Sequence, residues 1–358
     1  MGELQDYLDS EGIIFHPAVA ASLRDRLRSS RYYSLFRQRR WRKLANFALA
    51  ELHRALGSER IFSKPYFLAF DPTDACQLDC PFCTGGQTTQ PHTNSLEAYR
   101  SVMNRLGPWL IRAEIYRAGE PFVHPDILEM IRLAKSYGVG VDLSTNLMRL
   151  PENSAEKLVE SGVDSLMVSL DGITQETYSK YRRGGDLNAV LSNLKAVLAA
   201  RKRAGSRTPR VVWQFLVFKH NQHEIRDAVA LAKELGVDQI MFKGGYVPNE
   251  PALFEEWKTT LEDIGEFRGC SQDKTCPWPW GGINVNADGG ATLCYVDGKS
   301  YCQAENFGRE FDALWNGEHF RRARRVIALM QAGKLKPDPR SGFMCEKCHA
   351  FGSVNFWI

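Results

Sequence analysis

The chain has 358 residues, of which 44% are hydrophobic and 25% charged, and these values are ordinary for a globular protein that buries a substantial core. No apolar run approaches the ~20 residues of a membrane span, and the acidic start MGELQDYLDSEG lacks the apolar core of a secretory signal, so we expect a cytoplasmic protein. The net charge of +4 is too small to argue for a nucleic-acid partner.

The first 65 residues form a basic region with a helical pattern. The stretch RKLANFALAELHRAL repeats apolar residues at helical spacing, which predicts a helix. Between Arg24 and Lys43, nine Arg and Lys residues accompany a single acid, Asp25. This basic stretch is either a solvated helix face or a contact for an anionic membrane surface, a peptide or a phosphorylated substrate. We therefore expect a basic helical extension over residues 1–65, with its role left open.

Strand and helix patterns then alternate. Six segments are typical of strands: Tyr66–Thr73, Arg112–Glu120, Gly140–Asn146, Ser165–Gly172, Arg210–Phe218 and Gln239–Gly245. Helical segments lie between them, such as Glu224–Gly236, which ends on a glycine suited to a C-cap. This alternation predicts βαβ units and a parallel sheet in an α/β fold. Six units are too few for a closed eight-stranded barrel, so a partial barrel and a doubly wound sheet both fit.

The regular alternation ends near residue 251, where Trp and Cys become dense. Gly282–Cys294 has the pattern of a hairpin around an Asp-Gly-Gly turn, and Phe311–Gly333 has the pattern of one helix. The pair CEKC, which contains Cys345 and Cys348, follows. We expect an α/β domain over residues 66–250 and a small hairpin-plus-helix cluster domain over residues 251–358.

The stretch CQLDCPFC places Cys76, Cys80 and Cys83 in the loop after the first strand. Ligands bind at this end of α/β sheets. Thiolates are the soft ligands of iron–sulfur clusters, which ordinarily take four cysteines. Three thiolates leave one iron with an open position for a small molecule. A zinc site completed by His92 or Asp79 is the alternative, since structural zinc needs four closed ligands.

The C-x₃-C-x₂-C spacing, with the aromatic Phe82 before the last cysteine, resembles the signature of the radical S-adenosylmethionine (radical SAM) superfamily. The resemblance implies a partial (β/α)6 TIM-like barrel. It also implies that S-adenosylmethionine chelates the open iron of a 4Fe–4S cluster. An electron from the reduced cluster then cleaves the C–S bond, and the 5′-deoxyadenosyl radical abstracts a hydrogen from the substrate.

Motifs at the ends of the next strands resemble those of the same family. AGEP looks like the segment that holds the methionine amino group, and LSTN looks like the segment that binds ribose and carboxylate. VSLDG resembles the fourth-strand motif, which implies a polar contact from Ser169 and a structural role for Asp171. YRRGG resembles the segment whose arginine pairs with the methionine carboxylate; Arg183 fits the alignment, with Arg182 as the alternative. The resemblance assigns the nucleotide contacts to Phe82, Gly119, Glu120, Ser144, Asn146, Ser169 and Arg183.

The remaining cysteines lie in the last third of the chain. The predicted hairpin brings two thiols together and CEKC adds two more, which suits either a zinc ribbon or a Cys₄ cluster. The tail resembles the SPASM/twitch extension of radical SAM enzymes. It lacks the later C-x₅-C-x₃-C run, which indicates the twitch form with one auxiliary 4Fe–4S cluster. The resemblance assigns its ligands to Cys276, Cys294, Cys345 and Cys348, and it leaves Cys270 and Cys302 as substitute ligands or free core thiols.

An auxiliary cluster beside the substrate would make a net two-electron oxidation plausible. The adenosyl radical would take a hydrogen atom, a base a proton, and the cluster the second electron. Twitch enzymes with one four-cysteine cluster include aminocyclitol dehydrogenases, so the resemblance implies dehydrogenation of a sugar-like or aminocyclitol substrate. A flavodoxin or ferredoxin would supply the electron for cleavage. No catalytic base is assigned; polar candidates at the fifth and sixth strand ends are Gln214, Lys219 and Lys243.

Three alternatives remain open. The first is radical epimerisation or cross-linking of a ribosomally made peptide, and the second is modification of a lipid-linked glycan or isoprenoid. The third is a non-enzymatic iron–sulfur or zinc protein. That protein would have four permanent ligands at each site and no affinity for S-adenosylmethionine.

Overall fold

A computed structural model describes residues 40–83, 85, 89–261, 276–338 and 340–348. All six predicted strands are present, and each is shorter than its predicted segment. The strands are β1 (Phe67–Phe70), β2 (Arg112–Glu114), β3 (Gly140–Thr145), β4 (Ser165–Ser169), β5 (Arg210–Val217) and β6 (Gln239–Gly244). The polar residues at their carboxyl ends leave the sheet and enter the loops, as expected for the end of a parallel sheet at which ligands bind.

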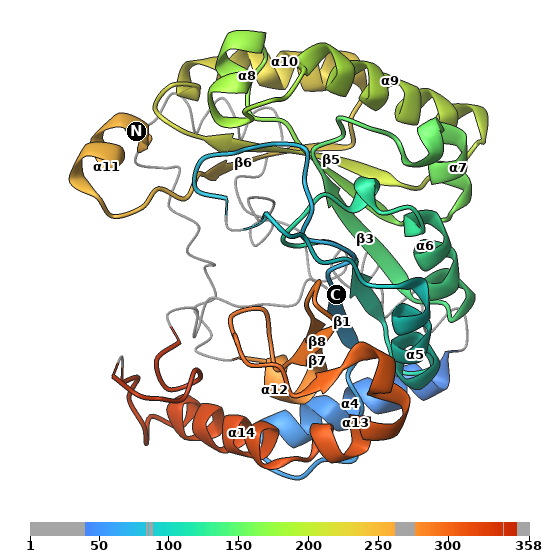
Figure 1. The fold of residues 1–358 in the computed structure, drawn as a ribbon, viewed down its shortest axis with the longest axis vertical. Helices are drawn as coiled ribbons and strands as arrows, with labels where there is room; N and C mark the ends of the chain where they lie inside the picture. The colour runs from blue at the N-terminus through green and yellow to red at the C-terminus, as the bar shows by residue number, and fades with distance from the viewer. Residues whose placement is uncertain (1–39, 84, 86–88, 262–275, 339, 349–358) are drawn as a thin grey trace.

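The strands form one curved sheet in the order β6-β5-β4-β3-β2-β1-β7-β8-β9, and the neighbours from β6 to β7 pair in parallel. Among the described residues β6 and β9 are its two edges, so the barrel is open, as predicted. Figure 1 shows the connecting helices on the outer side of the curve. They are α5 (Leu96–Leu106), α6 (Ile127–Ser136), α7 (Ala155–Glu160), α8 (Gln175–Tyr181), α9 (Leu187–Arg203) and α10 (Ile225–Leu235).

Strand alternation divides the sheet into two faces. Leu68 and Phe70 of β1, with Val141 and Leu143 of β3, belong to one buried cluster that they share with the outer helices. Because successive strand residues point to opposite faces, the residues between them face the concave side. Ser95 caps the start of α5, where its side chain accepts from Ala98 N, and Gly236 ends α10 at φ 75°, as predicted for that glycine.

The C-terminal hairpin is part of the same sheet. It consists of β7 (Gly282–Val285) and β8 (Gly290–Thr292), followed by the short β9 (Cys302–Gln303). β7 pairs in parallel with β1 over its whole length, which covers an edge that β1 would otherwise expose. The sequence predicts the hairpin correctly, but local patterning carries no signal for a pairing between segments more than 200 residues apart.

The long C-terminal helix of the sequence prediction is wrong. The structure has two helices, α13 (Phe307–Trp315) and α14 (Glu318–Gln331), with Asn316 and Gly317 between them. The Asn316 side chain bonds to the backbone of Ile61 on both sides, because its Oδ1 accepts from Ile61 N and its Nδ2 donates to Ile61 O. An asparagine that bonds to a distant backbone competes with the helix, and the following glycine weakens it further.

The predicted N-terminal helix is confirmed as α4 (Trp41–Ala55), which packs against α12 (Trp278–Gly281). Lys43 is buried, and its Nζ donates to the carbonyl oxygens of Leu110 (2.6 Å), Tyr137 (2.8 Å) and Gly138 (3.1 Å). Burial lowers the pKa of Lys43 to about 7. One lysine of the basic stretch therefore anchors α4 to the end of α6 rather than facing solvent. Residues 24–39 of that stretch lie outside the described residues.

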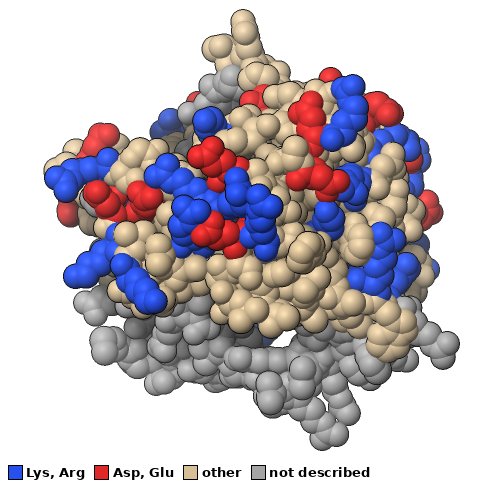
Figure 2. All heavy atoms as spheres, turned by 90° about the horizontal axis from the view of Figure 1, so that it is seen from below, with Lys and Arg blue, Asp and Glu red and all other residues tan. Residues whose placement is uncertain are grey.

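The surface charge is mixed on the side of α13 and α14. Figure 2 views the molecule from this side and shows Lys and Arg side chains next to Asp and Glu side chains. Ion pairs such as Arg325–Glu59 (2.6 Å) and Arg322–Glu346 (3.2 Å) account for part of this pattern. This face therefore carries no uniformly basic patch in the described part of the chain. None of the described helices is both long and apolar enough to cross a membrane.

Candidate functional site

The three-cysteine loop leaves the carboxyl end of β1 and is held by neighbouring loops. Asp79 N donates to Arg183 O at 3.0 Å. Asn146 Nδ2 lies 3.6 Å from Cys76 Sγ, and Arg182 Nη1 lies 3.9 Å from Cys80 Sγ. These two side chains offer N–H donors to the sulfurs, and such donors tune the potential of an iron–sulfur cluster. The loop thus gathers soft ligands together with groups that favour their charged form.

The three thiols are differently exposed and lie near one another. Cys80 is buried, Cys76 half-buried and Cys83 exposed. Burial raises the pKa of Cys76 and raises that of Cys80 to about 11, and the neighbouring thiols add to both shifts. A metal must therefore displace the protons when it binds. Among the described residues no three Cys, His, Asp or Glu side chains converge on a point as ligands of a single ion would. In an iron–sulfur cluster each thiolate binds a separate iron.

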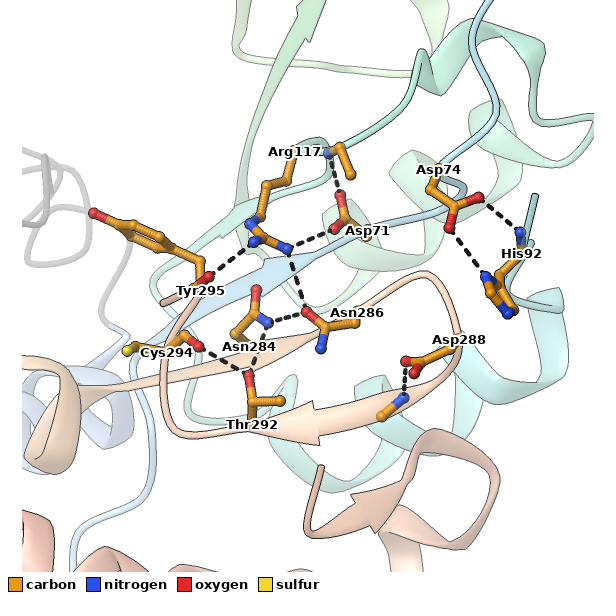
Figure 3. Close-up of polar contacts among 12 residues, drawn as sticks. Asp71, Asp74, His92, Arg117, Asn284, Asn286, Asp288, Thr292, Cys294 and Tyr295 are labelled. Carbon is orange, nitrogen blue, oxygen red and sulfur yellow. Dashed lines mark hydrogen bonds and ion pairs between the residues drawn. The ribbon is translucent and has the colours of Figure 1, made fainter. Parts of the chain in front are cut away.

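The alternative zinc ligand His92 has a different partner. Its Nδ1 lies 3.0 Å from Asp74 Oδ2, and its backbone N–H donates to Asp74 Oδ1 at 2.7 Å (Figure 3). The histidine is more than half exposed at the start of the segment that leads to α5. Its contacts therefore tie two loops together and do not support a zinc site on the thiols.

An aromatic cluster covers the cysteine loop. Phe82, at φ 61°, packs edge-on against Trp257 with ring centroids 5.2 Å apart. Trp257 ends α11 (Pro251–Trp257) and also contacts Phe218 and Tyr181. These rings share a cluster with Leu78 and Cys80, which keeps water from the buried side of the thiols. Sequence reasoning missed Trp257, because nothing local in the stretch PALFEEW marks which of its apolar residues contacts the cysteine loop.

Glu120 of the AGEP motif is buried and fully hydrogen-bonded. Its Oε1 accepts from Thr145 Oγ1 (2.7 Å) and Phe122 N (3.0 Å), and its Oε2 accepts from Asn146 N (2.7 Å). Burial raises the pKa of Glu120, while the three donors oppose that shift. The carboxylate thus joins the β2 and β3 ends, and it places Glu120 and Asn146 together as the sequence predicts. Thr145, which sequence reasoning passed over, completes this contact.

Gly119 lies where two loops touch. A Cβ on this residue would lie 2.4 Å from Thr73 O and 2.5 Å from Ala75 O, both of them backbone atoms of the loop that leads to Cys76. The next residue, Glu120, donates its N–H to the same Ala75 oxygen at 2.8 Å. Only a glycine lets the two loops approach this closely.

We expect Gly119→Ala to destabilise the protein by about 3 kcal/mol, because the backbone must shift to admit the methyl group. The shift would move Glu120 and the cysteine loop, so affinity for S-adenosylmethionine should fall as well. Chemical denaturation and anaerobic binding measure the two effects. Gly298→Ala is the matched control, since a Cβ there meets no atom within 4 Å. Equal stability of the two variants would contradict the expectation.

The other predicted nucleotide contacts lie at neighbouring strand ends. Ser144 is half-buried on β3, and Ser169 is buried on β4. Arg183 is exposed. Arg182 is instead largely buried and pairs through Nε with Asp171, whose Oδ1 accepts from Leu216 N. Asp171 has the structural role that the sequence predicts. The placement favours Arg182 over Arg183 as the cation beside the cluster loop, while both assignments stay predictions.

The four cysteines assigned to the auxiliary cluster come together from three segments. Cys276 precedes α12, Cys294 follows β8, and Cys345 and Cys348 belong to the tail. Burial raises the pKa of Cys294 to about 12 and raises those of Cys276 and Cys345 further, and neighbouring thiols of the set add to each shift. Four neighbouring thiols suit a Cys₄ cluster, whereas the zinc alternative of the sequence prediction requires all four to meet on a single ion.

Cys302 does not join this set. It lies in the main hydrophobic cluster, and its Sγ is 3.3 Å from Gln303 O. Burial raises its pKa to about 12, with Glu310 rather than another thiol as its charged neighbour. This is the core-thiol alternative of the sequence prediction. Cys270 lies outside the described residues.

The two cysteine sites share one strand. Cys294 and Trp278 form a buried cluster with Phe67 and Ala69, which lie on the concave face of β1. The Trp278 ring meets Phe67 and Tyr295 edge-on, each at 5.4 Å between centroids. The carboxyl end of the same strand leads through Asp71 to Cys76. The auxiliary site therefore lies on the concave side of the sheet whose loops carry the first site.

Comparisons with known proteins match both sites. The family model for the radical SAM superfamily matches residues 70–217, and the model for the SPASM iron-sulfur cluster-binding domain matches residues 276–349. An AdoMet-dependent heme synthase of Methanosarcina barkeri is 30% identical over 178 residues, which are 48% of each chain. A PqqA peptide cyclase of Gluconobacter oxydans is 26% identical over 65% of this chain and 71% of its own. The mycofactocin maturase MftC of Mycobacterium ulcerans is 28% identical over 48% of this chain and 45% of its own.

The matched segments thus span about half the length of the heme synthase and of MftC. Among solved structures, Streptococcus suis SuiB bound to S-adenosylmethionine is similar with a TM-score of 0.56 at 14% identity, over 90% of this chain and 77% of SuiB. Native anSMEcpe with bound AdoMet and Cp18Cys peptide gives a TM-score of 0.50 at 15% identity, over 73% of this chain and 84% of its own. At these identities the similarity concerns the fold.

Proposed function

The chain belongs to the radical SAM superfamily and carries a SPASM-type iron-sulfur cluster-binding domain, and on this premise we propose that it oxidises a polar, sugar-like small molecule. Cys76, Cys80 and Cys83 would hold the first 4Fe–4S cluster and leave one iron for S-adenosylmethionine. The four thiols of the C-terminal region, two of which are Cys276 and Cys294 next to the hairpin, would hold the auxiliary cluster. When bound, these groups supply hydrogen-atom abstraction and a one-electron acceptor.

The position of the auxiliary thiols carries this proposal. Two of them, Cys294 and Cys276, pack in the cluster formed with the concave face of β1, the strand that leads into the first cysteine loop. A one-electron acceptor on the wall that faces the substrate suits a net oxidation, because the substrate must lose a second electron after it loses a hydrogen atom. A structural cluster would need no such position. The buried aromatic residues Phe67 and Trp278 exclude water from the acceptor.

Polar side chains on the concave face support a polar substrate. Arg112 pairs with Asp142 and with Glu114 (3.4 Å) on this face, farther from the carboxyl ends of the strands. Nearer the carboxyl ends of the strands lie Gln214 of β5 and Lys243 of β6, both half-buried. Such groups can orient hydroxyl and amino substituents by hydrogen bonds.

Lys243 is the residue that we assign as proton acceptor. Strand alternation places it on the concave face, because its neighbour Phe242 belongs to the core under the outer helices. Burial lowers the pKa of Lys243 to about 8, which suits general base chemistry near neutral pH. Lys219, the other lysine candidate, bonds to Glu255 O at 2.9 Å at an exposed position and is not placed for this role.

Anaerobic reconstitution tests the proposed function. We expect about eight irons per chain, and formation of 5′-deoxyadenosine when the protein is reduced in the presence of S-adenosylmethionine. A library of sugars and aminocyclitols would then be screened for loss of two hydrogens by mass spectrometry. Stoichiometric zinc with no 5′-deoxyadenosine would instead support the non-enzymatic alternative.

Modification of a ribosomally made peptide is the second candidate. The relatives support it, because PqqA peptide cyclase shares 260 aligned residues with this chain, and SuiB, which has a similar fold, has been solved bound to the precursor peptide SuiA. Formation of 5′-deoxyadenosine would then be measured with a small peptide encoded beside this gene and with sugars. A rise with the peptide, and with no sugar, would favour the peptide over the small molecule.

A further inference from the structure

Arg117 lies between the two cysteine sites. It follows β2 and directly precedes the AGEP motif, so its backbone belongs to the nucleotide side. Its guanidinium reaches the hairpin: Nη2 donates to Tyr295 O at 2.8 Å, and Nη1 donates to Asn286 Oδ1 at 3.3 Å (Figure 3). Tyr295 is the residue after Cys294. One side chain thus links the AGEP loop to the backbone beside an auxiliary thiol.

Asp71 fixes the near end of this link. It is buried, and its two carboxylate oxygens are used separately: Oδ1 accepts from Ala118 N at 3.0 Å, and Oδ2 accepts from Arg117 Nη1 at 3.3 Å. Its own N–H donates to Val285 O of β7 at 2.9 Å. Asp71 therefore holds the first residue of the AGEP motif and the arginine at once, from the end of β1.

Hydrogen bonds continue through the hairpin to Cys294. Asn284 Nδ2 donates to Asn286 Oδ1 (2.8 Å) and to Thr292 Oγ1 (2.9 Å). Thr292 Oγ1 in turn donates to Cys294 O at 2.9 Å. Figure 3 shows these contacts as one continuous row from Asp71 to the Cys294 carbonyl. The backbone carbonyls of Cys294 and Tyr295 are therefore linked by hydrogen bonds to the strand ends that carry the nucleotide motifs.

We propose that Arg117 and Asp71 are positioning residues that couple the two sites, so that assembly of the auxiliary site tightens the AGEP loop for S-adenosylmethionine. This inference rests on the proposed function, which assigns the nucleotide to one loop and a cluster to the other. An arginine suits the task because its planar fork donates in two directions, which a lysine cannot reproduce. Energetic coupling requires that each site bias the same structural element, and the arginine contacts both.

The test is a double-mutant cycle on the reconstituted full chain, with the dissociation constant of S-adenosylmethionine as its readout. Cys345→Ala perturbs the auxiliary site without touching the arginine. In the wild-type background we expect it to weaken nucleotide binding by about fivefold or more, the usual lower range of allosteric coupling. In an Arg117→Met background, which already lacks the link, Cys345→Ala should have no further effect on the dissociation constant.

Arg100→Met is the matched control. Arg100 is 39% exposed and makes one ion pair with Glu129, whereas Arg117 is 40% exposed and makes the link, so neither change leaves a buried cavity. In an Arg100→Met background, Cys345→Ala should weaken nucleotide binding as much as it does in the wild type. In an Arg117→Lys background it should weaken binding by only part of that amount. An unchanged effect in Arg117→Met, or no effect in the wild type, would overturn the coupling alone. A wild-type chain that assembles clusters and binds no nucleotide would overturn the proposed function itself.

Discussion

Cys80→Ala should abolish formation of 5′-deoxyadenosine from S-adenosylmethionine and leave about four irons per chain. Cys80 is the buried member of the three-cysteine loop and the one that faces Arg182. Without it the first cluster has two ligands from the loop, too few to hold four irons. The auxiliary thiols come from other segments and should keep their cluster. Iron and sulfide analysis together with chromatography of the nucleoside products measures both effects.

Two other cysteine variants complete this experiment. Cys345→Ala should also leave about four irons, yet it should retain reductive cleavage of S-adenosylmethionine, because the first loop is intact. Cys302→Ala should leave about eight irons, since its thiol lies in the hydrophobic core away from both sets. Continued nucleoside formation by Cys80→Ala, or loss of one whole cluster in Cys302→Ala, would contradict the ligand assignment.

The strands and their parallel pairing were predictable because their signal is local. Alternating strand and helix patterns indicate βαβ units, and these left both a partial barrel and a doubly wound sheet as arrangements. The cysteine loop was predictable for the same reason, since three thiols stand within eight residues. Gly236 at the end of α10 follows from the single fact that a glycine tolerates positive φ.

The contacts between distant segments were not predictable from one sequence. The parallel pairing of β7 with β1, the Trp257 cover over Phe82 and the Arg117 link each join residues far apart in the chain. No local periodicity marks such partners. The choice between Arg182 and Arg183 was not predictable for a similar reason. The two arginines are adjacent and identical in type, and only the conformation of the loop decides which side chain is buried and which is exposed.

The contacts between the predicted domains are likewise not marked in the sequence. The sequence predicts an N-terminal extension over residues 1–65 and a cluster domain over residues 251–358, and these limits stay predictions. In the structure the hairpin extends the sheet of the barrel, and α4 packs against α12 of the cluster region. The segments before and after the barrel therefore stabilise one another, and one fully buried side chain takes part in that connection.

That side chain is Arg324 of α14, which is fully buried. Its Nε donates to Pro279 O (2.8 Å), and its Nη2 donates to Trp315 O (2.7 Å). Its Nη1 donates to Glu59 O (2.9 Å) and to Asn316 Oδ1 (3.3 Å). Burial lowers the pKa of Arg324 to about 9. The guanidinium thus joins the segment after α4, the helix after Cys276 and the break between α13 and α14.

Arg324→Met should destabilise the reconstituted protein by about 4 kcal/mol. Methionine fills much of the volume but removes the donor of three backbone carbonyl oxygens, those of Pro279, Glu59 and Trp315, and this loss exceeds the gain from removing a buried charge. Arg325→Met is the control one residue away: Arg325 is 59% exposed and pairs with the Glu59 carboxylate, so its loss should cost about 1 kcal/mol or less. Chemical denaturation under anaerobic conditions measures both. Because α12 follows Cys276, Arg324→Met should also lose auxiliary iron before the barrel unfolds, whereas similar stabilities for the two variants would show that the terminal segments are held by other contacts.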